Sequence, residues 1–175
     1  MHRGITRILA AASSGLAVLA LSGLTAAAAT DTGWVPDGPY EPETVNACGT
    51  TLTITDKINK VERRERVDDE GNVREDFRGK YVVKVKAADG RKVVLDNSGS
   101  YSVFSYANGD TFVPVRSPAL IYPFDPVERA AFKRAGLPPV FYYTRGRLEL
   151  FIKSDGQEIV LKKPKDPVSI CKLLR

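Results

Sequence analysis

The sequence predicts an all-β protein: an antiparallel meander of about eight to ten strands that closes into a small barrel, with one short helix. Two observations support this class. Residues 81–115 consist of short runs rich in Val, Tyr and Phe, separated by Asp-Gly, Ser-Gly and Asn-Gly turn signals. Only residues 125–137 combine the start and stop signals of a helix. A two-sheet β-sandwich is the alternative, and the barrel is favoured because most connections are short hairpins.

Residues 1–29 have the pattern of a secretory signal peptide. Arg3 and Arg7 form a basic start, residues 8–24 are apolar apart from Ser and Gly, and residues 27–29 are alanines suited to cleavage before Thr30. An uncleaved membrane anchor is the alternative, because the apolar run nearly spans a bilayer. Cleavage is favoured because the run is rich in small residues. We therefore expect a secreted, extracellular protein with no membrane span after cleavage.

Loss of this segment limits the chemistry of the mature chain. It leaves 24 basic and 21 acidic residues, a formal charge of +3, which does not indicate a nucleic-acid partner. It also removes His2, the only histidine of the sequence. Catalysis by Ser-His-Asp or Cys-His and metal sites that contain histidine are then excluded. The sequence shows no cofactor motif and no set of metal ligands, so we expect neither a cofactor nor a metal.

The remaining chain is predicted to be a linker followed by one domain. Residues 30–46 contain three prolines and two glycines, which disfavour regular ladders and predict an extended linker. Trp34, the only tryptophan, either folds back onto the domain or lies in a free tail. Residues 47–175 form a single β-barrel-like domain. Cys48 and Cys171 are its only cysteines, and in an exported chain they are expected to pair and join the first strand to the last.

The first part of the domain alternates between apolar and polar residues. Leu52, Ile54 and Ile58 share one side of a strand over residues 50–59. Residues 60–79 are mostly charged and turn near Gly71, which predicts a polar hairpin beyond the core. Its arginines suggest a polyanion site, but interleaved acidic residues favour a solvated face with local ion pairs.

The second part contains the aromatic strands and the helix. Residues 101–106 place aromatics on both faces of one strand, and Pro114 and Pro118 indicate an edge or a bulge. Asp125 and Glu128 form a capping box for the helix near 126–135. Residues 140–153 are an apolar run with a bulge or turn at Arg145-Gly146, residues 157–162 return, and 168–174 form the last strand.

Clustered aromatic side chains are the strongest indication of a ligand site. A partly hollow barrel lined by Tyr and Phe could hold a small apolar ligand, although the same residues also fill ordinary barrel cores. The candidate ligand-binding residues are Tyr101, Phe104, Tyr106, Phe141, Tyr142 and Tyr143. No catalytic residue is identified.

The leader, Cys48-Gly49, the Asp-Gly and Asn-Gly hairpins and the Tyr-Thr-Arg-Gly-Arg stretch at 143–147 resemble small exported actinobacterial proteins with no assigned activity. The resemblance is compatible with a calycin-like or allene-oxide-cyclase-like β-barrel. It implies no catalytic or binding residue.

Three functions are compatible with these features. The favoured one is a secreted, non-enzymatic protein that binds a small apolar ligand or an extracellular partner. The first alternative is a cofactor-free cyclase or isomerase that confines its substrate in the barrel. The second is a basic protein bound to a cell-envelope polymer. The absence of recognisable catalytic groups favours a protein that is not an enzyme.

Overall fold

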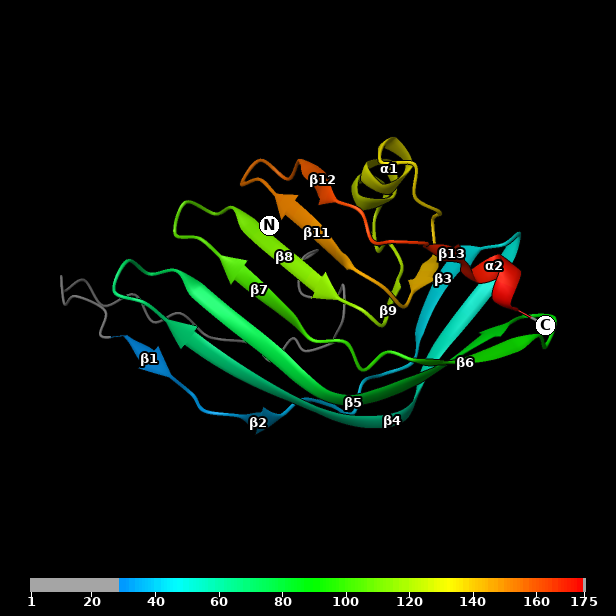
Figure 1. The fold of residues 1–175 in the computed structure, drawn as a ribbon, viewed down its shortest axis with the longest axis horizontal. Coiled ribbons are helices and arrows are strands. Elements are labelled where there is room, and N and C mark those ends of the chain that lie inside the picture. Colours follow the sequence, from blue (N-terminus) through cyan, green and yellow to red (C-terminus); the bar gives the residue numbers. More distant parts are fainter. Residues whose placement is uncertain (1–28, 175) are drawn as a thin grey trace.

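The computed structural model describes residues 29–174, which form two antiparallel β-sheets and two short helices (Figure 1). The predicted leader, residues 1–29, lies outside the described residues except for Ala29. The predicted antiparallel, mostly β class is confirmed. None of the helices within residues 29–174 has the length and apolar character needed to cross a membrane.

The elements are β1 (Thr30–Asp31), β2 (Val35–Pro36), β3 (Glu43–Ala47), β4 (Thr50–Val67), β5 (Val73–Ala87), β6 (Lys92–Asp96), β7 (Tyr101–Ser105), β8 (Thr111–Arg116), β9 (Ala119–Ile121), α1 (Pro126–Arg134), β10 (Phe141–Tyr143), β11 (Arg147–Ile152), β12 (Glu158–Lys162), β13 (Val168–Ser169) and α2 (Ile170–Leu173).

The hairpin of β4 and β5 is the centre of the large sheet, whose strands follow the order β1-β4-β5-β7-β8-β11-β12. This long hairpin curves strongly (Figure 1). Two irregularities accompany the curve: the register shifts between Asp56 and Ile58, and Gly79 has a φ of +126° opposite Val61. A Cβ atom at Gly79 would lie 2.1 Å from the carbonyl oxygen of Lys60, so only glycine fits there.

The predicted meander is wrong at β6 and β7, because these consecutive strands both pair with β5 and not with each other. β6 pairs with residues 82–86 and β7 with residues 73–77, so they extend opposite halves of the hairpin. Within residues 29–174 this strand order ends at β1 and β12, while β2, β3 and β6 are further edge strands, and no closed barrel is found.

The connection from β6 to β7 depends on a close backbone approach at Gly99. Its N–H donates to the carbonyl oxygen of Pro118 at 3.1 Å. An added Cβ would lie 2.1 Å from the oxygen of Arg116 and 2.5 Å from that of Pro118. We therefore expect Gly99→Ala to lower the free energy of unfolding by about 3 kcal/mol or more, measured by urea denaturation. Ser100→Ala, at the exposed next position, is the control, and an equal effect of the two changes would contradict this prediction.

The small sheet, in the order β13-β10-β9, packs with its two faces against different parts of the large sheet. Leu120 belongs to one apolar cluster, with β3, β4, β5 and β6, whereas Ala119 and Ile121 belong to a second, with β8 and β11. Alternate residues of a strand point to opposite faces, so one short apolar strand supplies both clusters. This is why β9 is buried along its whole length.

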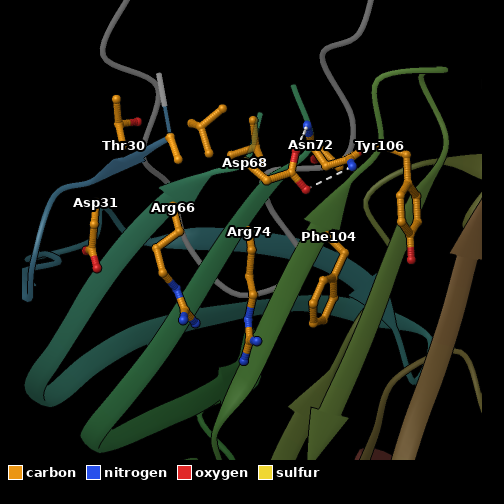
Figure 2. A pocket seen from close by; sticks show the side chains of 12 residues that line it. Thr30, Asp31, Arg66, Asp68, Asn72, Arg74, Phe104 and Tyr106 are labelled. Carbon is orange, nitrogen blue, oxygen red and sulfur yellow. Dashed lines mark hydrogen bonds between the residues drawn. The ribbon is translucent and has the colours of Figure 1, made fainter. Parts of the chain in front are cut away.

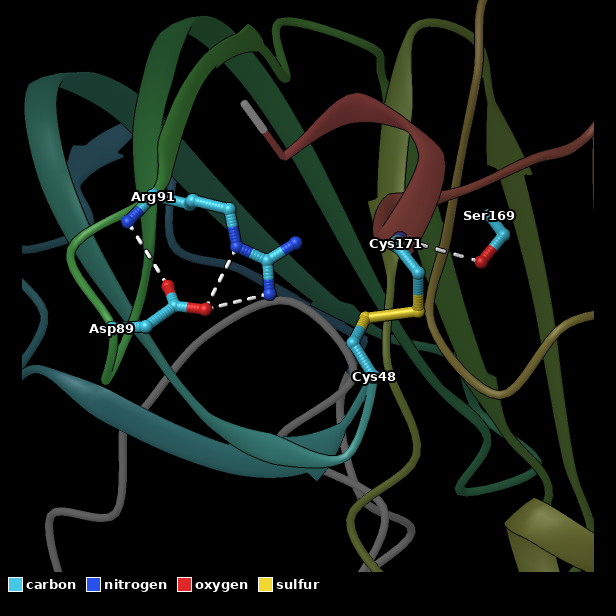
Figure 3. Close-up of a disulfide and its surroundings, with 5 residues drawn as sticks. All are labelled: Cys48, Asp89, Arg91, Ser169 and Cys171. Atoms are coloured by element: carbon cyan, nitrogen blue, oxygen red, sulfur yellow. Dashed lines mark hydrogen bonds and ion pairs between the residues drawn. A yellow bond between two sulfur atoms is a disulfide. The ribbon is translucent and has the colours of Figure 1, made fainter.

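The predicted disulfide is confirmed. Cys48 lies in the turn between β3 and β4 and Cys171 lies in α2, with their Cα atoms 5.3 Å apart (Figure 3). The predicted last strand is partly wrong, because a helical turn replaces it from Ile170. The hydroxyl of Ser169 accepts a hydrogen bond from the backbone N–H of Cys171 at 3.3 Å and so caps this turn.

The predicted helix is confirmed as α1. Asp125 is its N-cap and accepts from the backbone N–H of Glu128 at 2.8 Å, and Pro126 opens the first turn. The carboxylate of Glu128 reaches back one residue further than a standard capping box and accepts from the N–H of Phe124 at 2.8 Å. Phe132 is fully buried and packs α1 onto the second apolar cluster.

The segment predicted as a linker runs along β4 as β1, β2 and β3, so its prolines do not prevent short ladders. Trp34 folds back onto the sheet, because the guanidinium carbon of Arg78 lies 3.9 Å from the centre of its ring.

Candidate functional site

The structure divides the six aromatic residues expected at a ligand site. Phe141 and Tyr143 are buried in the second apolar cluster, where the Tyr143 hydroxyl donates to the oxygen of Val115 at 2.8 Å. The Tyr142 hydroxyl donates to the oxygen of Asp96 at 2.7 Å. These three side chains therefore have structural contacts of their own.

The other three aromatics lie on β7 or directly after it. Tyr101 points inward and stacks on Phe77, with ring centres 4.1 Å apart. Phe104 points to the opposite, outer face of the sheet, and Tyr106 is exposed after the end of β7. Phe104 and Tyr106 are thus brought together at one groove, which Tyr101 does not line.

A row of apolar side chains crosses this outer face at one register position. We call it the apolar row; each member is directly opposite the next and each is partly exposed. The row extends over about 14 Å, since neighbouring strands are about 4.8 Å apart. The ring centres of its first two members are 5.9 Å apart. Its members are Phe104 on β7, Phe112 on β8, Phe151 on β11 and Ile159 on β12.

Strand periodicity explains why these residues face outward. Phe112 lies between Thr111 and Val113, which are 4% and 1% exposed, and its side chain points away from them. The outer face of an antiparallel sheet is usually polar, so a row of phenylalanines there is informative. In the sequence, apolar residues occur at both odd and even positions of β8 and β11, so both faces of these strands carry apolar side chains. This pattern does not reveal which face stays open to solvent.

Two arginines continue the same register beyond Phe104. Arg74 on β5 is opposite Phe104, and Arg66 on β4 is opposite Arg74. The guanidinium carbon of Arg74 lies 5.0 Å from the centre of the Phe104 ring. Figure 2 shows Arg66, Arg74 and Phe104 projecting from neighbouring strands on the same side. An apolar strip therefore ends at a pair of guanidinium groups.

These residues are among those that line a groove of about 460 Å³ at the end of the β4–β5 hairpin. Figure 2 shows the side chains of Arg66, Arg74 and Phe104 on one side of the strands and that of Thr30 on the other. Thr30 and Asp31 of β1 form one wall, and the β7 side contributes the opposite wall. Chain segments from four strands and two turns thus converge on it. The lining residues are Ala29, Thr30, Asp31, Arg66, Val67, Asp68, Asn72, Val73, Arg74, Phe104, Ser105 and Tyr106.

Asp76 holds both arginines in place. It is paired with Arg74 at 2.9 Å and with Arg66, and it accepts from the hydroxyl of Ser102 at 2.6 Å. Burial raises the pKa of Asp76, but the hydrogen bonds from Ser102, Arg66 and Arg74 outweigh this effect and hold the pKa below its ordinary value. Asp76 is therefore ionised at neutral pH and keeps the two guanidinium groups oriented.

One donor of Arg66, a residue that lines the groove, has no hydrogen-bond partner among residues 29–174. This donor is the Nε, which is buried. A buried donor without a partner is costly, and a ligand oxygen could satisfy it if the Arg66 side chain turns this nitrogen toward the groove.

A second polar cluster lies where the N-terminal segment crosses the hairpin. The Tyr81 hydroxyl donates to Asp56 at 2.8 Å, the backbone N–H of Tyr40 donates to Asp56 at 3.1 Å, and the Tyr40 hydroxyl donates to Asp37. Burial, together with these carboxylates, raises the pKa of both tyrosines, so they remain protonated donors. Because both hydroxyls already have partners, this cluster fixes residues 37–40 to β4 and β5.

Comparison with protein-family models finds no match, and comparisons with curated proteins and with solved structures find no significant match. Within residues 29–174, no group of three or more His, Cys, Asp or Glu side chains could hold a metal ion. The chemistry of the groove and of the apolar row therefore rests on their own geometry.

Proposed function

We propose that this protein is a secreted, non-enzymatic binding module for a single-chain amphiphile. The apolar row would bind the alkyl chain, and the groove at Arg66 and Arg74 would bind a head group with oxygen acceptors. The observation that supports this most directly is the register that joins the row and the two arginines into one continuous strip.

The charge and shape of the strip favour this ligand over a purely apolar one. Apolar side chains occupy one end, whereas the other end offers guanidinium donors, one of them unpartnered. Binding of a ligand with an alkyl chain and an acceptor head group would do two things. It would remove the apolar surface of the row from water, and it would give the buried Nε of Arg66 a hydrogen-bond partner. Export is supported by the predicted leader and by the disulfide, since disulfides persist in oxidising compartments.

Calorimetric titration with decanoate, decanol and decylammonium, each below its micelle concentration, tests the proposal. These probes share a chain and differ in the head group. Phe112→Ala is expected to weaken decanoate binding about tenfold, because the chain loses a contact at the centre of the row. Arg66→Gln should weaken decanoate binding similarly and decanol binding much less, since the guanidinium makes a charge-assisted bond with a carboxylate and only a weaker one with a neutral hydroxyl.

Val94→Ala is the matched control, because Val94 is 47% exposed on β6, outside the row. Equal losses in Val94→Ala and Phe112→Ala would contradict the proposal. Binding of lipid vesicles without binding of monomeric decanoate would indicate a membrane surface as the occupant. Self-association in analytical ultracentrifugation that Phe112→Ala abolishes would indicate a second copy of the chain. Either of these two results would overturn the assignment to a single-chain ligand.

A further inference from the structure

The position of Thr30 connects the predicted leader to the groove. Ala29 and Thr30 both line the groove, and Thr30 pairs in register with Val67. Thr30 is labelled in Figure 2. The expected cleavage site lies between these two residues. Hydrolysis of the Ala29–Thr30 peptide bond by a signal peptidase consumes one water, leaves a carboxylate on Ala29 and a free amino group on Thr30. Ala29 then leaves the wall of the groove with the leader.

The described segment around β1 is well held, so the new amino group would stay at the groove. The backbone N–H of Thr32 donates to the oxygen of Glu65 at 3.0 Å, and the N–H of Glu65 donates to the Thr32 hydroxyl at 3.0 Å. Asp31 accepts from the N–H of Gly33 at 2.9 Å and pairs with Arg64. These contacts come from residues directly after Thr30.

The charges already present at the groove cancel, so the new amino group decides the net charge there. Among the lining side chains, Arg66 and Arg74 are balanced by Asp31 and Asp68. The two neighbouring charges that pair with this set, Arg64 and Asp76, also balance each other. An α-amino group has an ordinary pKa of about 7.7–8.0, so it is largely protonated at pH 7. It would give a balanced groove a net positive charge.

We propose that removal of the leader completes the ligand site, with the α-ammonium of Thr30 acting beside Arg66 and Arg74 as a third cationic donor. This inference rests on the proposed function and specifies its ligand as an anionic amphiphile. In the uncleaved chain the same nitrogen is a neutral amide bonded to Ala29, so the precursor binds the anionic head group weakly. Binding is thereby confined to the exported, processed protein.

The test uses the full-length chain expressed with its leader and purified after export. Its intact mass identifies the first residue, and Thr30 is expected. The α-amino group is then acetylated near pH 6.5, where lysines remain protonated, which removes the charge. Reductive methylation of the same group keeps the charge and is the matched control.

Acetylation is expected to weaken decanoate binding about tenfold and leave decanol binding unchanged, whereas the methylated protein binds decanoate as the unmodified protein does. Raising the pH from 7 to 9 should weaken decanoate binding only while the α-amino group is free. A mature chain that begins at another residue overturns the inference, as does an acetylated protein with unchanged decanoate affinity. If decanoate binding survives acetylation but is lost in Phe112→Ala, only this inference fails. If no decanoate binding occurs at all, the proposed function fails.

Discussion

Lowering the pH from 8 to 5 is expected to stabilise this protein, because the folded state keeps a proton on Glu128 of α1. This side chain is 3% exposed, and its Oε1 has no hydrogen-bond partner among residues 29–174. Burial raises the pKa of Glu128 to about 8, against the effect of the Phe124 N–H, with Glu158 and Asp125 raising it further. Burial has the largest effect on the pKa of Glu158. Together with the nearby Asp125 it raises the pKa of Glu158 to about 7, although Arg134 acts to lower it.

The sign of the effect follows from proton binding. In the unfolded chain the pKa of a glutamate is 4.5, so between pH 4.5 and 8 the folded state binds more protons than the unfolded state. Below pH 4.5 the protonated Glu128 makes its full contribution to the free energy of unfolding. This contribution is lost as the pH rises through about 8. For Glu128 the loss amounts to about 4–5 kcal/mol across that window.

Urea denaturation at several pH values measures this dependence. Glu128→Gln is expected to flatten the curve and to raise the stability at pH 8, since glutamine keeps an acceptor for the Phe124 N–H without ionising. Glu41→Gln, at an exposed site before β3, is the control and should leave the slope unchanged. A pH dependence that Glu128→Gln leaves unchanged would contradict a raised pKa for Glu128.

Removal of the disulfide is the second change with a large expected effect. The bridge joins residues 123 positions apart, from the β3–β4 turn to α2. Closing a loop of this length lowers the entropy of the unfolded chain and is worth about 4–5 kcal/mol in the chain-entropy model. The bridge also holds α2 against the apolar cluster that contains Ile170 and Leu174. The double variant Cys48→Ser/Cys171→Ser should therefore lose about this much stability.

The free energy of unfolding in urea, compared for oxidised wild type, reduced wild type and the double variant, tests this expectation. Dithiothreitol should lower the stability of the wild type to that of the variant and leave the variant unchanged. A double variant within about 1 kcal/mol of the oxidised protein would mean that the unfolded chain is already compact without the bridge.

Local chemistry explains the features that could be predicted from the sequence. The helix at 126–134 follows from Asp125, Pro126 and Glu128, because capping depends on residues within one turn of each other. The disulfide follows from elimination, since only two cysteines exist. Alternation correctly identified the buried side of β4 at Leu52 and Ile54. It was wrong at Ile58, which follows the register shift and is opposite Val82 on the other face. These inferences need no knowledge of distant contacts.

The missed features all depend on long-range pairing. Turn signals predict that β6 and β7 follow one another, but not that the chain at Gly99 crosses to the other half of β5. The open outer face could not be predicted either, because Phe112 and Phe151 are equally suited to a barrel core. Four of the six expected ligand residues have packing or hydrogen-bond partners elsewhere. The sequence suggests Arg66 as part of a polyanion site but favours a solvated face, and it does not single out Arg74.

The amino-acid sequence alone predicts the β class, the helix with its caps, the paired cysteines and the expected cleavage point. Each of these depends on composition or on neighbours a few positions away. The folded arrangement adds the curved hairpin, the small sheet packed between two clusters, and the apolar row that ends at two arginines. Backbone alternation assigns every strand two faces, but which face is covered depends on the strands and helices that pack there from distant parts of the chain.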